Sequence, residues 1–285
     1  MMNKSIVEEF VNKDVFEKII QYLEANNCSG IPLFKDNYLK RRIYLRAKAL
    51  KFDDINDYYV YLKSNKDEIK VFDDIITINV TYFFRHQETY DTLKEKVLSE
   101  IFERKSKKGE SFLKILFVGC ASGEEVYSLA MILQEHFSKE ILFIKPYMLG
   151  IDYDNNSIMK ARIGVYDKQE LTNVPSEFIK KYFEPLDSRK FIISPQIKKM
   201  VVFRHEDFFK SDIKRYWDII FCRNMLIYLN GEAQEELIRK LYNLCIDGGY
   251  LVLGKSETLT GNSRKFFSSA FIKERIFKKR RAYES

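Results

Sequence analysis

Apolar residues in the first quarter of the chain recur at intervals of three and four residues, as on the buried face of a helix. Gly30 and Pro32 interrupt this pattern. The spacing predicts short amphipathic helices over residues 5–75, with later members at about 36–50, 52–65 and 66–76. The apolar positions of the first helices are Ile6, Phe10, Val15, Ile19, Ile20 and Leu23.

From about residue 114 the pattern changes to short, continuous apolar runs that alternate with amphipathic stretches. Such runs are typical of parallel strands buried on both faces, and their alternation with helices predicts a doubly wound α/β sheet. The predicted strands cover residues 114–118, 146–151, 201–203, 217–222 and 250–254. The predicted helices between them cover residues 124–136, 155–162 and 232–245.

One segment, residues 164–203, interrupts the alternation. It contains Pro175, Pro185 and Pro195 and two possible strand pieces, so we interpret it as a small inserted β-subdomain. The chain is therefore predicted to form an N-terminal helical domain over residues 1–77 and an α/β domain over residues 78–285.

Composition narrows the class of protein. The 285 residues are 46% hydrophobic, but no apolar run approaches the ~20 residues of a membrane span, and the N-terminus lacks the apolar core of a signal peptide. The four cysteines form no CxxC pair and no zinc-binding spacing, so no metal site is predicted. These features predict a reduced, soluble, cytoplasmic protein. The net charge of +7 is compatible with a nucleic acid or an acidic protein as partner.

The turn after the first predicted strand is the first candidate for ligand binding. Gly119 and Gly123 would let the backbone approach a ligand at a helix N-terminus. The spacing is GxxxG and no GK[ST] follows, which disfavours a dinucleotide or nucleoside triphosphate. Glu124 and Glu125 would instead attract a cationic ligand such as S-adenosylmethionine. Alternatively, they only complement the helix dipole.

Acidic residues follow two further predicted strands. Asp152 is placed to accept hydrogen bonds from both hydroxyls of a ribose, while Asp154 is the better candidate for capping the next helix. Asp207 follows the strand at 201–203, where an acid can accept a hydrogen bond from the amino group of an adenine. A simple turn residue is the alternative for Asp207.

Two segments carry arginines near the predicted ligand. Arg223 and Asn224 come directly after the strand at 217–222, at the sheet edge where open α/β sheets bind ligands. Arg85 ends the run at 78–85, which could fold over a ligand. The alternative is that Phe83 and Phe84 belong to the core and that Arg85 caps a helix.

Taken together, these segments resemble the CheR family of chemotaxis methyltransferases over nearly the whole chain. The resemblance implies a class I methyltransferase domain with a Rossmann-like sheet that uses S-adenosylmethionine, an N-terminal all-α domain and a small β-subdomain. It further implies a protein-glutamate O-methyltransferase. The matching motifs are N-x-T-x-F-F-R at 79–85, G-E-E-x-Y-S at 123–128, D-Y-D at 152–154, A-R-x-G-x-Y at 161–166 and F-C-R-N-x-x-I-Y at 221–228, with K-S-E at 255–257 fitting a small polar segment of the family.

The resemblance also assigns site residues. Arg223 and Tyr228 would orient the acceptor, and Arg85 would hold a carboxylate. Asp207 and Phe208 stand where the family usually has Asn and Leu; Asp can accept from the adenine amino group but cannot donate to a ring nitrogen. With Gly119 of the glycine turn included, the implied cofactor-binding residues are Asn79, Thr81, Arg85, Gly119, Glu125, Asp152, Asp207, Phe208, Cys222 and Arg223.

The implied reaction moves a methyl group to a carboxylate that is already ionised near neutral pH, so no general base is predicted. The implied partners are the acidic methylation helices of chemoreceptors, which would dock on Arg41, Arg42 and Arg46; a receptor C-terminal peptide could also bind at the β-subdomain. The docking residues could alternatively be a solvated face. Two rival functions stay open, a nucleic-acid methyltransferase, which the absence of an N-P-P-Y-type tetrapeptide disfavours, and a non-catalytic adaptor.

Overall fold

The computed structural model describes residues 4–26, 28, 30–77, 80–214 and 216–280. The chain divides into two compact units. The first comprises Met1–Ile78 together with Tyr228–Gln234, and the second comprises Asn79–Ile227 together with Glu235–Ser285. No helix in the described ranges combines the length and the apolar character that crossing a bilayer requires.

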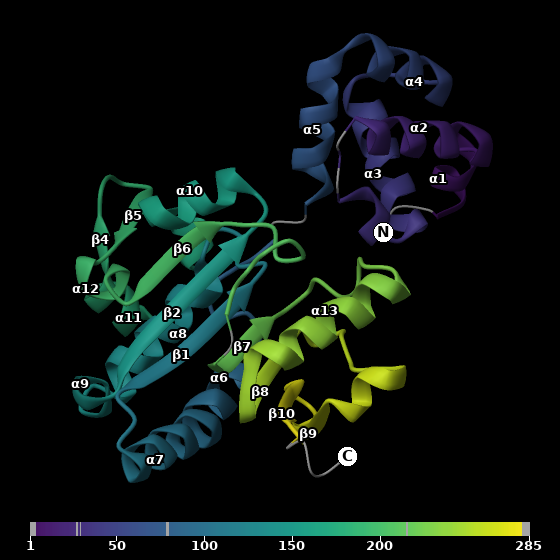
Figure 1. Cartoon of the computed structure of the whole chain (residues 1–285). Helices are drawn as coiled ribbons and strands as arrows, with labels where there is room; N and C mark the ends of the chain where they lie inside the picture. The colour runs from purple at the N-terminus through teal and green to yellow at the C-terminus, as the bar shows by residue number, and fades with distance from the viewer. Residues whose placement is uncertain (1–3, 27, 29, 78–79, 215, 281–285) are drawn as a thin grey trace. The chain divides into compact units, whose positions relative to one another are not determined.

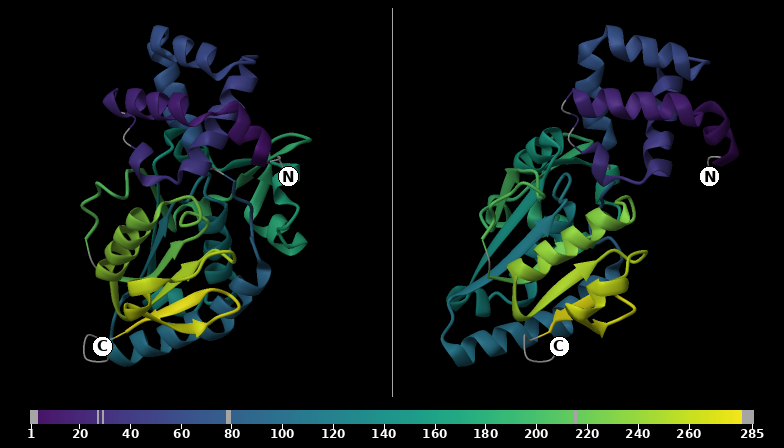
Figure 2. Two further views of the ribbon diagram at one scale, coloured as in Figure 1. Left: turned by 90° about the vertical axis from the view of Figure 1, so that its right-hand side faces the viewer. Right: turned by 45° about the vertical axis from the view of Figure 1, so that its right-hand side comes forward.

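The first unit is built from helices, which appear in purple to blue in Figure 2. Three of them begin at side-chain caps: Asn12, Asp54 and Asn65 each accept a hydrogen bond from a backbone amide in the first turn that follows. The predicted apolar faces meet in one core, in which Ile19, Leu23, Ile43, Leu62 and Phe72 are fully buried; the prediction was wrong for Ile6, which is 47% exposed. The helices are α1 (Lys4–Phe10), α2 (Lys13–Ala25), α3 (Asp36–Ala49), α4 (Ile55–Ser64) and α5 (Lys66–Ile76).

A buried ion pair connects α3 to α5 inside this unit. Arg46 donates from Nε and Nη2 to the two carboxylate oxygens of Glu68, at 2.7 and 2.6 Å. The Glu68 side chain is 1% exposed and also accepts from the Tyr58 hydroxyl at 3.2 Å. Arg46 is therefore part of the internal structure of the helical unit.

The segment Tyr228–Gln234 joins the helical unit although the sequence places it in the second domain. The Tyr228 carbonyl accepts from the Lys35 amide at 2.9 Å, and Asn230 donates its amide to the Leu33 carbonyl at 2.9 Å. The ring of Tyr228 packs on that of Tyr38, with 5.1 Å between centroids. These long-range backbone pairs have no local sequence signature.

The second unit contains a seven-stranded sheet in the order β6-β2-β1-β7-β8-β10-β9, whose strands lie side by side in Figure 1. The strands from β6 to β8 are parallel, and β10 is antiparallel to both of its neighbours. The predicted doubly wound α/β sheet is confirmed. Its strands are β1 (Phe112–Val118), β2 (Lys145–Asp152), β6 (Val201–His205), β7 (Trp217–Cys222), β8 (Cys245–Leu253), β9 (Phe267–Phe271) and β10 (Ile276–Lys279).

The helices of this unit include a continuous helical segment that the apolar pattern did not predict. Residues 87–108 form α6, a π-helical stretch and α7, because their apolar residues pack into the main core while charged residues such as Glu103 and Lys107 stay outside. Strand β8 begins at Cys245, earlier than the strand predicted at 250–254, and therefore includes the glycines at 248 and 249. The helices are α6 (Gln87–Thr92), α7 (Ser99–Lys108), α8 (Glu124–His136), α9 (Glu140–Phe143), α10 (Asn155–Ile163), α11 (Ser176–Tyr182), α12 (Pro195–Lys198) and, from Glu235 onward, α13 (Gly231–Leu244), with Leu93–Leu98 as the π-helical stretch.

A separate three-stranded antiparallel sheet interrupts the alternation, within the range predicted for an inserted subdomain. Its order is β3-β5-β4, so the two short strands β3 and β4 are its edges. Tyr166 of β3 is buried, and its hydroxyl donates to the Ser122 carbonyl at 2.6 Å. The strands are β3 (Val165–Asp167), β4 (Phe183–Pro185) and β5 (Lys190–Ile193).

Candidate functional site

The glycine turn after β1 is held against the end of β2. The amides of Gly119 and Cys120 both donate to the Ile151 carbonyl at 3.0 Å. Gly123 caps α8 with φ 91°, and a Cβ at this position would lie 2.9 Å from the ring of Phe203. Because a side chain there would be both strained and in collision with a core ring, the backbone that starts α8 requires glycine.

Asp152 fastens this turn to the carboxyl end of β2. One carboxylate oxygen accepts from the Ala121 amide at 2.8 Å and the other from the Asp154 amide at 2.9 Å. Burial raises the pKa of Asp152, while the two backbone amides act in the opposite direction. Each oxygen keeps acceptor capacity beyond these bonds, so the carboxylate can also bind hydroxyl groups of a ligand.

Asp154 caps the next helix, α10, which is the role that the sequence predicted for it. It accepts from the amides of Asn156 and Ser157 at 2.9 and 3.2 Å and thereby caps α10. The assignment of the cap to Asp154 is confirmed, which leaves Asp152 as the acid available to a ligand.

The two adjacent glutamates at the start of α8 have different partners. Glu124 is 2% exposed, and both of its carboxylate oxygens lie within 2.9 Å of the Ser122 hydroxyl. Glu125 forms an ion pair with Arg223. Both carboxylates thus have specific side-chain partners in addition to any effect on the helix dipole.

Glu124 makes the stability of the protein depend on pH. Burial raises its pKa from 4.5 to about 7, so the folded state keeps a proton that the unfolded state releases above its ordinary pKa. The stabilisation of the folded state by this retained proton is complete below the pKa of Glu124 in the unfolded chain. It is lost as the pH rises toward 7, and its full size is about 3 kcal/mol.

We therefore expect the free energy of unfolding of the wild type to fall, relative to that of Glu124→Gln, between about pH 5 and 7. Urea denaturation of both proteins across this range measures the difference. Parallel pH curves for the two proteins would show that Glu124 does not titrate in this window.

Arg223 is a deeply buried charged group of the candidate site, with its side chain 1% exposed. It donates from Nη1 to Glu125 and from Nη2 to the Arg85 carbonyl at 2.9 Å. Nη2 also lies 3.0 Å from Nδ1 of His86. Its Nε has no hydrogen-bond partner in the described part of the chain.

Several buried polar atoms near this arginine lack a partner within the described ranges. They are Thr81 Oγ1, Arg85 Nε, Arg223 Nε and Asn224 Oδ1, from the segment before the sheet and from the loop after β7. Such atoms are uncommon in folded proteins because each loses its bond to water without replacement. Two arginine N–H donors favour an anionic group such as a carboxylate, so a ligand with that group fits this part of the unit.

The loop after β6 carries the residues predicted for the adenine. Asp207 accepts from the Phe209 amide at 3.0 Å, and Phe208 is buried. Lys240 of α13, which the sequence analysis did not single out, donates to the carbonyls of Phe209 and Ser211 at 3.1 and 3.0 Å and to that of Phe208. Three backbone carbonyls on one ammonium fix the conformation of this loop.

The remaining predicted residues are distributed as follows. Cys222 ends β7 fully buried, and burial raises the pKa of its thiol. Asn79 lies outside the described residues. Tyr228 belongs to the helical unit, so its predicted role beside Arg223 stays a prediction.

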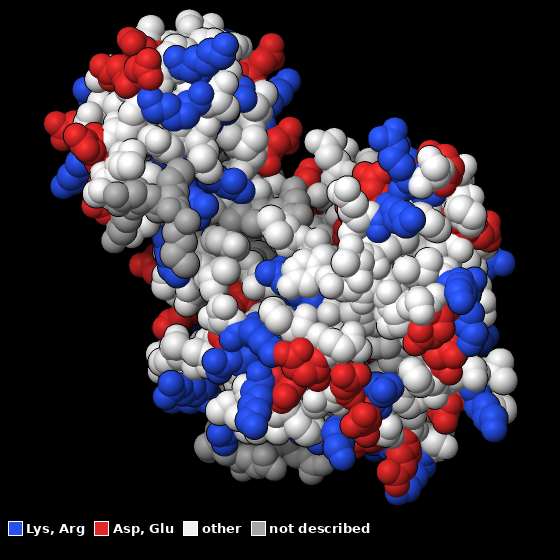
Figure 3. Space-filling model, turned by 180° about the vertical axis from the view of Figure 1, so that it is seen from behind, with Lys and Arg blue, Asp and Glu red and all other residues white. Residues whose placement is uncertain are grey.

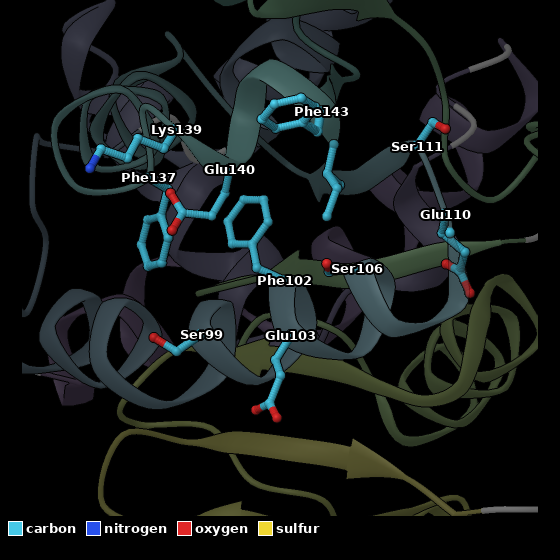
Figure 4. Close-up of a pocket in the computed structure, with 12 residues that line it drawn as sticks. Ser99, Phe102, Glu103, Ser106, Glu110, Ser111, Phe137, Lys139, Glu140 and Phe143 are labelled. Atoms are coloured by element: carbon cyan, nitrogen blue, oxygen red, sulfur yellow. The ribbon is translucent and has the colours of Figure 1, made fainter.

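A cavity of about 810 Å³ lies at the other end of the strands. Figure 4 shows Phe102, Phe137 and Phe143 around it, together with acidic side chains from α7 and from the start of α9. Its walls come from α7, from the segment before β1 and from the segment before β2, which are the amino ends of these strands. Ligands of doubly wound sheets bind at the carboxyl ends, so this cavity is not the candidate site.

The chain is similar to known proteins along most of its length. Residues 14–77 match the family described as "CheR methyltransferase, all-alpha domain", and residues 79–275 match "CheR methyltransferase, SAM binding domain". A "Chemotaxis protein methyltransferase" of Borreliella burgdorferi is 29% identical over 264 residues, which cover 91% of this chain and 93% of the relative. A protein with the same description from Campylobacter jejuni is 29% identical over 272 residues, covering 94% and 97% of the two chains.

Proposed function

Because this chain belongs to the CheR family of S-adenosylmethionine-dependent methyltransferases, we propose that it esterifies glutamate side chains of chemoreceptors. The family match confirms the resemblance found in the sequence, the class I methyltransferase fold and the cofactor. The glutamate acceptor and the receptor as substrate are our proposal. The observation that supports it best is the buried, incompletely paired Arg223 at the carboxyl end of β7.

The residues present fit the cofactor. Asp152 would accept hydrogen bonds from its ribose hydroxyls, Glu125 would attract its ammonium group, and the Nε of Arg85, which has no partner among the described residues, would donate to its carboxylate. The loop fixed by Lys240 would place Asp207 at the adenine amino group. When bound, the cofactor supplies an electrophilic methyl group on a positively charged sulfur.

The protein's own contribution is to position the acceptor. A glutamate carboxylate is ionised near neutral pH, so its oxygen would accept the methyl group that the bound cofactor supplies, with the sulfur as leaving group. No proton moves, so the site needs no base. Arg223 would orient the carboxylate through its Nε–H, which has no partner among the described residues.

Methyl incorporation from labelled S-adenosylmethionine tests this function directly. Purified protein is incubated with membranes that contain chemoreceptors, and base-labile methyl groups are released as methanol and counted. We expect label on receptor, none on RNA or DNA, and little with a receptor whose methylation-site glutamates are replaced by alanine. Base-stable label on nucleic acid, or no label in the presence of bound cofactor, would contradict the proposal and favour one of the rival functions.

The charges on one face of the molecule disfavour a nucleic-acid site on that face. On the face shown in Figure 3, basic side chains are interspersed with acidic ones and do not form one continuous field. Nucleic-acid binding typically rests on a basic patch or stripe. The proposal also places the enzyme in the cytoplasm, where the methylation helices of receptors lie, and the free cysteines at 28, 120, 222 and 245 are compatible with this.

The predicted docking residues on α3 differ in how far they are available to a partner. Arg46 pairs with Glu68, and Arg42 donates to the Tyr38 hydroxyl at 2.8 Å and to the Thr77 carbonyl at 2.9 Å. Arg41 is exposed. We therefore assign the electrostatic contact with the acidic receptor helix mainly to Arg41, with Arg42 and Arg46 shaping the surface around it.

We expect Arg41→Glu to raise the KM for receptor about three- to tenfold and to reduce its dependence on salt, without changing the affinity for cofactor. Lys18→Glu makes the same charge change on the exposed face of α2 and serves as the control. Arg46→Glu should instead destabilise the protein by about 3 kcal/mol, because it leaves Glu68 buried without its partner. Equal KM values for Arg41→Glu and Lys18→Glu would remove the docking role.

The proposed peptide site at the β-subdomain uses the strand edges of the small sheet. An extended peptide could add to β3 or β4, since both are edge strands. Binding of a receptor C-terminal peptide to the full chain, measured by fluorescence anisotropy, tests this part independently of catalysis.

A further inference from the structure

His86 lies next to the arginine that ends the N-x-T-x-F-F-R motif, just outside the pattern that the sequence analysis used. It precedes α6 in a left-handed conformation, with φ 61°. Its Nδ1 is 3.0 Å from Nη2 of Arg223. A guanidinium has donors only, so Nδ1 must be the acceptor and the ring proton resides on Nε2.

This contact completes a set of three acceptors around one guanidinium. Glu125 binds Nη1, while the Arg85 carbonyl and His86 Nδ1 both bind Nη2. The guanidinium is planar, so fixing its two terminal nitrogens also fixes the direction of the Nε–H bond. That bond is the buried donor with no partner in the described part of the unit.

The surroundings of His86 keep its Nδ1 able to accept a hydrogen bond. Partial burial and the positive charges of Arg223, Arg85 and Lys255 lower its pKa to about 4. Lys255, in the loop after β8, forms an ion pair with Glu88 of α6. At neutral pH the imidazole is uncharged, whereas a protonated ring would lose the acceptor and repel Arg223.

We propose that His86 is a positioning residue for methyl transfer, which by accepting from Arg223 Nη2 directs the Nε–H of that arginine toward the acceptor carboxylate. The inference rests on the proposed role of Arg223 in the acceptor site. His86 itself contacts neither reactant in this proposal, so its effect must appear in turnover and not in cofactor affinity.

Three substitutions separate this role from a structural one. His86→Asn places an amide oxygen close to the position of Nδ1, and asparagine tolerates a positive φ. His86→Leu keeps the bulk without an acceptor. His86→Lys adds a permanent charge facing Arg223, and Gln87→Lys adds the same charge at the exposed neighbouring position as a control.

We expect kcat to fall about tenfold in His86→Leu and about 100-fold in His86→Lys, because the donor is displaced from the acceptor. His86→Asn should regain at least a third of the wild-type value, and Gln87→Lys should be unchanged. The dissociation constant of S-adenosylhomocysteine, measured by calorimetry, should stay within about threefold of the wild type in all four variants. Thermal unfolding identifies any variant whose loss comes from folding.

The outcomes are distinguishable from those that test the function itself. A wild type without methyl transfer would overturn the proposed function. An active wild type with His86→Leu at full turnover, with His86→Asn no better than His86→Leu, or with cofactor affinity falling in parallel with turnover would overturn the role of His86 alone.

Discussion

Replacing Arg223 by alanine is expected to lower kcat for methyl transfer by about 100- to 1000-fold, which is the usual effect of removing one preorganised donor from an active site. The dissociation constant of S-adenosylhomocysteine should change less than about tenfold, since Asp152 and the loop at Asp207 remain. Calorimetry and single-turnover methyl transfer measure the two quantities separately.

The expected split between turnover and binding follows from the geometry around Arg223. Its terminal nitrogens contact Glu125 and the segment at Arg85 and His86, and its Nε is a buried donor without a partner among the described residues. In the proposed function, truncation removes this donor from the place where the acceptor carboxylate would align with the methyl group. Glu125 is simultaneously released and remains available to the cofactor ammonium.

Two further variants separate the loss of this donor from a loss of folding or of surface charge. Arg223→Lys retains the positive charge for Glu125 but loses the planar fork, so it should fold like the wild type and stay catalytically impaired. Arg239→Ala removes an exposed arginine from α13 and should be fully active. Unchanged turnover in folded Arg223→Ala would exclude the residue from the acceptor site.

The sequence predicted the central part of the sheet because these strands are buried on both faces. The runs at β1 and β7 are almost continuously apolar, and a run of that kind has few other stable environments. Parallel strands end at the same edge of a sheet, so the amino-acid pattern alone associates Arg223 with the glycine turn. The antiparallel strands β9 and β10 carry partly exposed, mixed residues and gave no such signal.

The sequence could not predict which polar groups would find each other across long separations. From the sequence, Arg46 was predicted to be a surface cation, but in the structure it pairs with Glu68 of another helix. His86 and Lys240 lie 137 and 31 residues along the chain from their partners Arg223 and Phe209. Because such pairs depend on how the helices and strands pack, no local pattern of apolar and polar residues predicts them.

Replacing Asp152 by alanine is expected to raise the dissociation constant of S-adenosylhomocysteine about 100-fold. Each hydrogen bond from a neutral hydroxyl to a carboxylate is worth about 1.5 kcal/mol or more, and two ribose hydroxyls would be lost together. The substitution also removes the bond that holds the amide of Ala121, a residue with φ 45° in the glycine turn. Isothermal titration with the purified protein measures the change.

Asp154→Ala is the matched control, because it removes the same side chain two residues away. It should cost about 1 kcal/mol of stability through loss of the α10 cap, and leave cofactor affinity within about threefold of the wild type. Asp152→Asn keeps the shape of the side chain but replaces one acceptor by a donor, so it should bind the cofactor almost as poorly as Asp152→Ala. If Asp154→Ala weakened binding more than Asp152→Ala, the assignment of ligand and cap to these two acids would be reversed.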